Sequence, residues 1–173
     1  MRLHSHLAVV AAGVLALATL GVPQAGVAAE PGSREAIDQA AAVNTELALA
    51  YMREGNLKAA REKIDKALQQ DARTANTQMA AGFVYDKLGD KKKALSHFEQ
   101  AVKLGGKDNP DVVANAAVYF CMNGEPKRGE QYMLQAAASP LNARPDVAYT
   151  NAGRCARGDG RPKDAEQSFR KAL

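Results

Sequence analysis

Three features of this chain could carry chemistry: a histidine, two cysteines and a glycine-rich turn. His97 is the single histidine outside the first 29 residues, and Cys121 and Cys155 lie far downstream of it. Zinc sites need closely spaced pairs of such ligands, so this spacing predicts no metal site. A Ser-His-acid nucleophilic site would need the same His97, and no Gly-x-Ser-x-Gly elbow is present to hold a serine. We therefore interpret His97 as a surface or half-packed helical residue.

The glycine-rich turn is Gly105-Gly106-Lys107, and Asp108 follows it where a phosphate-binding loop would have Ser or Thr. The 23 Lys and Arg residues are interleaved with 19 Asp and Glu residues, and no stacking aromatics accompany them. This pattern disfavours nucleic-acid binding. The sequence thus predicts no enzyme, no cofactor and no small-molecule substrate.

Residues 1–29 are typical of an export signal. Arg2 opens a short polar region, an apolar run covers 7–20, and Val27-Ala28-Ala29 gives small residues for cleavage before Glu30. The run is too short to span a bilayer, although an uncleaved membrane anchor is an alternative. Because neither cysteine lies near this segment, no lipid anchor is predicted. We expect an exported, periplasmic protein, associated with the outer membrane, if at all, through a partner.

The composition indicates helices. Residues of the AVILMFWYC set make up 46% of the chain, Trp is absent, and aromatic residues total 5%. Small-residue helix packing fits this profile better than a sheet does. Residues 30–40 are expected to form a linker and a helix start, with Ser33 able to cap the helix.

A repeat then runs through the chain. Four glycines recur at a nearly constant spacing, where a first helix must end and turn: Gly55, Gly89, Gly124 and Gly160. Small residues recur in phase on both helices, for example at Ala48, Gly82, Ala117 and Gly153. Large residues recur beside them, for example at Ile64, Phe98, Met133 and Phe169. Small residues let two antiparallel helices approach closely, and the large ones fill the gap one turn away.

This pattern resembles the tetratricopeptide repeat. The predicted fold is an all-α, right-handed superhelix of antiparallel helix pairs, with about four repeats at 41–74, 75–108, 110–143 and 146–173. The usual closing proline is replaced by Ala72 and Gly106, and Ala156 leaves the fourth unit thinly packed. We expect this last unit to be incomplete or uncapped, because the sequence ends at Leu173. A shortened form, or a partner on the last face, would explain that.

Cys121 and Cys155 are predicted to form a disulfide. Export would place both in an oxidising compartment, and they are the only two cysteines. In the repeat register they lie on neighbouring first helices with a two-residue offset, which turns one side chain by roughly 200° so that the two can face each other. Two free buried thiols are the alternative.

The inner surface of such an array is predicted to bind a protein partner. Eight inward positions form the predicted groove: Leu49, Met52, Met79, Phe83, Val118, Met122, Arg154 and Arg157. Three repeats supply apolar, methionine-rich surface that can adapt to varied partners, and the fourth adds two guanidinium groups. For Leu49 and Met52 the alternative is burial under the N-terminal helix.

Two segments carry a more specific resemblance. Residues 139–155 include Ser-Pro-Leu-Asn and Ala-Tyr-Thr-Asn-Ala-Gly-Arg-Cys, and residues 113–124 end in Cys-Met-Asn-Gly. Together with 43–55 they resemble the type IV pilus biogenesis and stability proteins, the tetratricopeptide pilotin family. Ala116 and Ala117 replace the family's Tyr and Gly, and a lipid-anchoring motif usual there is missing.

The resemblance implies a non-enzymatic factor that helps the outer-membrane secretin of the pilus machine, or another pilus-assembly component, to localise, assemble or remain stable. One alternative is a periplasmic adaptor for another envelope complex. A second is a scaffold that recruits cell-wall enzymes.

Overall fold

A computed structural model describes residues 30, 32–106 and 108–173, and the predicted export signal lies outside them. The described residues form α-helices and no strands. The helices are α1 Arg34–Arg53, α2 Leu57–Gln70, α3 Ala75–Lys87, α4 Lys91–Gly105, α5 Pro110–Met122, α6 Pro126–Ala137, α7 Pro145–Gly158 and α8 Pro162–Ala172. Within this part of the chain, none of the helices has the length and apolar character needed to cross a membrane.

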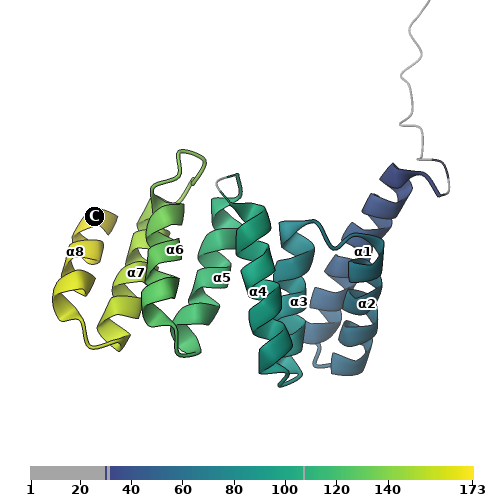
Figure 1. The fold of residues 1–173 in the computed structure, drawn as a ribbon, viewed down its shortest axis with the longest axis horizontal. Helices are drawn as coiled ribbons and strands as arrows, with labels where there is room; N and C mark the ends of the chain where they lie inside the picture. Colours follow the sequence, from purple (N-terminus) through teal and green to yellow (C-terminus); the bar gives the residue numbers. More distant parts are fainter. Residues whose placement is uncertain (1–29, 31, 107) are drawn as a thin grey trace, which may run out of the picture.

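The helices pair as four hairpins, α1 with α2, α3 with α4, α5 with α6 and α7 with α8. Figure 1 shows the hairpins side by side in chain order. Each hairpin turns at one of the four periodic glycines, whose φ angles are 78°, 80°, 93° and 72° in chain order. Only glycine adopts this left-handed backbone without a steric cost, which explains why the residue recurs.

Capping residues or prolines stand at the starts of most of these helices. Ser33 caps α1, with its Oγ accepting a hydrogen bond from the Ala36 backbone N at 3.1 Å. Asn56, Asp90 and Asn109 cap α2, α4 and α5 in the same way. Helices α5 to α8 each begin with a proline, whose missing N–H has no helical partner at that position anyway.

Within a hairpin, glycines meet aromatic rings. A Cβ atom added to Gly82 of α3 would lie 2.8 Å from the Phe98 ring of α4. The same arrangement recurs in the last hairpin, where a Cβ on Gly153 would lie 2.6 Å from the Phe169 ring. The alternation of small and large residues therefore sets how closely the paired helices approach.

The array is curved, with the first helix of each hairpin on the inside. Helix α1 contacts α3, α3 contacts α5, and α5 contacts α7. No Cα–Cα distance within 8 Å joins any two of α2, α4, α6 and α8 in the described part of the chain. Since the members of a curved array lie closest on its inner side, α1, α3, α5 and α7 line the inner face.

Buried side chains gather in two clusters. The larger one draws on α1 to α5 and contains Ile64, Val84, Tyr85, Phe98 and Phe120. Its centre is aromatic, because the Phe98 ring stacks on Tyr119 with centroids 4.3 Å apart.

The smaller cluster joins α5, α6 and α7. Its buried members are Ala117, Met133, Ala152 and Cys155. No aromatic ring is among these four, so this cluster buries much less surface than the first.

Candidate partner-binding face

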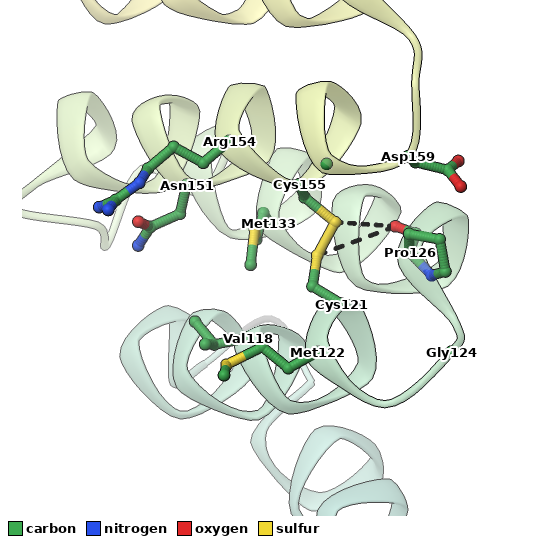
Figure 2. Close-up of a pocket in the computed structure, with 11 residues that line it drawn as sticks. Val118, Cys121, Met122, Gly124, Pro126, Met133, Asn151, Arg154, Cys155 and Asp159 are labelled. Carbon is green, nitrogen blue, oxygen red and sulfur yellow. Dashed lines mark hydrogen bonds between the residues drawn. A yellow bond between two sulfur atoms is a disulfide. The ribbon is translucent and has the colours of Figure 1, made fainter.

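The two cysteines are joined in the structure. A Cys121–Cys155 disulfide connects α5 to α7, with Cα atoms 5.7 Å apart. The Cys155 Sγ also lies 3.1 Å from the Pro126 carbonyl oxygen, a contact drawn dashed in Figure 2. A disulfide sulfur carries no hydrogen, so this contact becomes a true hydrogen bond only if the thiol is reduced. The predicted pairing is present, and it links two inner-face helices.

A cleft of about 550 Å³ opens beside this disulfide, between α5 and α7. Its size falls within the range of about 300–1,000 Å³ that is usual for ligand sites. The cleft is lined by Val118, Cys121, Met122, Gly124, Pro126, Met133, Asn151, Arg154, Cys155, Gly158 and Asp159. Three of the eight predicted groove residues, Val118, Met122 and Arg154, are therefore brought together here.

Helical spacing explains this convergence. On α5, Val118, Cys121 and Met122 lie three and four residues apart and share one face. On α7, Asn151, Arg154 and Cys155 do the same. The disulfide holds the two faces against each other, and Met133 of α6 lies between them (Figure 2).

The other apolar residues of the predicted groove lie upstream on the inner helices. Leu49, Met52, Met79 and Phe83 are half-buried and pack against the larger cluster. The Phe83 ring meets Phe98 edge-on, with centroids 5.1 Å apart. These side chains therefore support the core and remain partly exposed. The alternative of burial under the N-terminal helix is wrong for Leu49 and Met52, because both lie within that helix, α1.

Arg157 lies outside the cleft. Its side chain is exposed, and its guanidinium carbon lies 5.9 Å from the centroid of the Phe169 ring on α8. The guanidinium groups of Arg154 and Arg157 therefore lie in different surroundings, and of the two only Arg154 borders the cleft.

His97 is half-buried, as predicted. Its Nδ1 lies 2.7 Å from the Gln78 Oε1, and its ring stacks on Tyr85 with centroids 5.3 Å apart. Burial, and then the charge of Lys93, lower the pKa of His97 against the opposing effects of Asp65 and Asp90. The neutral ring is thereby favoured, and with a proton on Nδ1 it donates to Gln78.

Tyr85 is a second structural polar group. Its hydroxyl donates a 2.5 Å hydrogen bond to the Asp65 Oδ1. Burial, together with that carboxylate, raises the pKa of Tyr85 to about 12, so the phenol stays protonated.

Among the described residues, no group of three or more His, Cys, Asp and Glu side chains could hold a metal ion.

Sequence reasoning missed two arginines that tie neighbouring hairpins together. Arg128 of α6 donates to Glu99 of α4 at 2.9 Å and to Glu125 at 2.8 Å. The sequence analysis had no account of this pair, because its two residues are 29 positions apart.

Arg161, before α8, is the second of these arginines. It pairs with Glu130 of α6 at 2.5 Å and with Asp159 and Asp164 at 2.8 Å each. Bonds to three carboxylates raise the pKa of Arg161 above its ordinary value. The short spacing of Asp159, Arg161 and Asp164 could have indicated two of these ion pairs from the sequence. Only the contact with Glu130 depends on how the helices pack.

Comparison with known proteins supports the repeat assignment. Residues 39–105 match the tetratricopeptide repeat family. A protein of Haemophilus influenzae, described as uncharacterized, is 32% identical over 101 residues, which cover 58% of this chain and 56% of that protein.

Two solved structures are similar over most of the chain. PilW, described as a widely conserved type IV pilus biogenesis factor, has a TM-score of 0.68 and 26% identity, over 78% of this chain and 61% of that one. Pseudomonas aeruginosa PilF has a TM-score of 0.69 and 23% identity, over 79% and 61%. The chain thus spans less than two thirds of the length of each. These similarities, with the four curved hairpins, show that the chain has the fold of a tetratricopeptide-repeat superhelix.

Proposed function

We propose that this protein is a non-enzymatic interaction scaffold in type IV pilus biogenesis. In this role it assists the outer-membrane secretin, or another pilus-assembly component, in localising, assembling or remaining stable. The observation that carries the proposal is the similarity to PilW over 78% of the chain at 26% identity. Proteins of this fold typically bind other proteins along their inner face.

The inner face supports this role. It carries a cleft with apolar walls, and Met122 at its edge is 79% exposed. An exposed methionine beside an apolar cleft is suited to a protein contact, because its flexible side chain adapts to a partner. Export through the predicted signal in residues 1–29 would bring this chain to the side of the membrane where such a partner is accessible.

Co-isolation from the envelope of a piliated bacterium tests the proposal. Tagged wild-type protein is expected to retain the secretin, and Met122→Glu is expected to lose it. Leu104→Glu is the matched control, because Leu104 is 42% exposed on α4, a second helix of its hairpin, and does not line the cleft. All three proteins should keep the same helical circular dichroism.

The alternatives predict other results. A peptidoglycan enzyme in the eluate would identify a cell-wall scaffold, and a different envelope complex would identify an adaptor of another system. Intact-mass measurement of the exported protein checks its location. A mature chain starting at or near Glu30 without acyl mass is expected, and a retained signal or an acyl chain contradicts the predicted processing.

A further inference from the structure

The cleft between α5 and α7 has an unequal charge distribution. Figure 2 shows Arg154 and Asn151 at one end and Asp159 at the other, with the disulfide between them. The Asp159 carboxylate accepts a 2.8 Å hydrogen bond from Arg161, so its charge is already compensated.

Arg154 has no such partner. Among the described residues, no ion pair or hydrogen bond joins its side chain to another group, and its side chain is exposed. Arg128 and Arg161, by contrast, each bind two or more carboxylates. The cleft therefore offers one uncompensated guanidinium, a group whose planar donors match a carboxylate.

The remaining lining is suited to a peptide. Val118 and Met133 provide an apolar floor, and the exposed Met122 can close over a bound side chain. The Asn151 carboxamide is also without a hydrogen-bonding partner in the described residues. It carries both a donor and an acceptor, which is what the backbone of an extended chain requires.

We infer that this cleft binds an extended segment of a protein partner in which an Asp or Glu lies within about three residues of a large apolar side chain. The apolar group packs on Val118 and Met133, the peptide backbone pairs with Asn151, and the carboxylate binds Arg154. The inference rests on the proposed function only in taking the inner face as the partner-binding surface. It names the chemistry of the partner segment and not the complex to which that segment belongs.

Selection from a displayed library of random twelve-residue peptides tests this inference. The full chain, purified without reductant, is expected to enrich sequences with an acidic residue close to Leu, Ile, Met or Phe. Arg154→Glu should lose this acidic preference and favour Lys or Arg instead. Arg170→Glu is the matched control, because Arg170 is exposed on α8, lies outside the cleft and pairs with Glu166 among the described residues. It should enrich the same acidic sequences as the wild type.

A synthetic enriched peptide then gives a quantitative readout by fluorescence anisotropy. Arg154→Glu and Val118→Asp should each weaken binding at least about tenfold, the loss expected when a buried or charge-paired contact is removed. Arg170→Glu should leave it unchanged, and circular dichroism should show the same helicity in all variants. No enrichment, enrichment without acidic residues, or identical selection by Arg154→Glu would overturn the inference.

The two proposals fail separately. If acidic peptides bind through Arg154 but no secretin is co-isolated, the peptide site stands and the pilus role falls. If the secretin is co-isolated but Arg154→Glu selects the same peptides as the wild type, the pilus role stands and the peptide inference falls.

Discussion

The two halves of the array are held together by different means. Helices α1 to α5 share a cluster rich in buried aromatic and branched side chains, among them Phe98, Tyr85 and Ile64. Helices α5 to α7 share a smaller cluster, whose buried members are Ala117, Met133, Ala152 and Cys155. Where the apolar cluster is small, the chain adds a disulfide and the ion pairs of Arg161. Covalent and ionic links thus substitute for buried surface in the half that carries the cleft.

The largest effect is expected for Phe98→Ala. Phe98 is fully buried and contacts Phe83 and Tyr119, so its removal leaves a cavity and should lower the free energy of unfolding by about 3–5 kcal/mol. Phe169→Ala is the matched change in the last hairpin. The Phe169 ring is half-exposed, and its loss should cost roughly 1 kcal/mol. Urea unfolding of both variants measures the difference, and equal losses would contradict the unequal burial of the two halves.

Reduction of the disulfide is expected to have the next largest effect. The bond closes a loop with a sequence separation of 34, and its loss should cost about 3–4 kcal/mol on the chain-entropy model. Because the bond joins α5 to α7, amide hydrogen exchange should rise mainly in α5 to α8. A variant with Cys121→Ser and Cys155→Ser is the control, since reductant should not alter its unfolding. A uniform rise from α1 to α8 would instead mean that the array unfolds as one unit.

The turns and the disulfide could be predicted from the sequence, because both depend on residues that recur at regular spacings. The glycine turns follow from a period that is repeated four times, and the disulfide from a two-residue offset within that period. The exposure of the side chains in the predicted groove could not be predicted in the same way. The inward position of Phe83 in the repeat does not determine how deeply its ring is buried against Phe98. That depth depends on Gly82 and on the neighbouring hairpin. The contact from Arg128 to Glu99 also depends on how two hairpins stack, and no short spacing encodes it.

Adding a methyl group at Gly82 or at Gly153, where each glycine lies against an aromatic ring, should again have different effects on stability in the two halves of the array. Gly82→Ala places a Cβ 2.8 Å from the buried Phe98 ring, which cannot move away, so we expect a loss of about 1–3 kcal/mol. Gly153→Ala places a Cβ 2.6 Å from Phe169, but that half-exposed ring can swing outward. The helical preference for Ala over Gly, worth about 1 kcal/mol, should then leave this variant close to wild type. Thermal unfolding measures both, and a Gly153→Ala loss as large as that of Gly82→Ala would show that α8 is held rigidly.

The smallest expected effect is a pH dependence confined to the first half. Burial lowers the folded-state pKa of His97 below its ordinary value of 6.5, so the unfolded chain takes up a proton more readily as the pH falls. The stability contributed by the neutral ring is therefore complete above about pH 6.5 and is lost as the pH falls through the lower folded-state pKa. Because the ring is half-exposed, solvent screening should keep the change well under about 1 kcal/mol.

Hydrogen exchange at pH 7.5 and pH 5.5 can resolve this small change by its location. Protection should fall in α3 and α4, where His97 contacts Gln78 and Tyr85, and His97→Gln should remove the difference between the two pH values. The guanidinium of Arg161 keeps its proton at both pH values, because its pKa is raised further above an already high value. Loss of protection in α7 and α8 alone would contradict this assignment, since it would place the titrating contact in the hairpin that the disulfide and Arg161 hold.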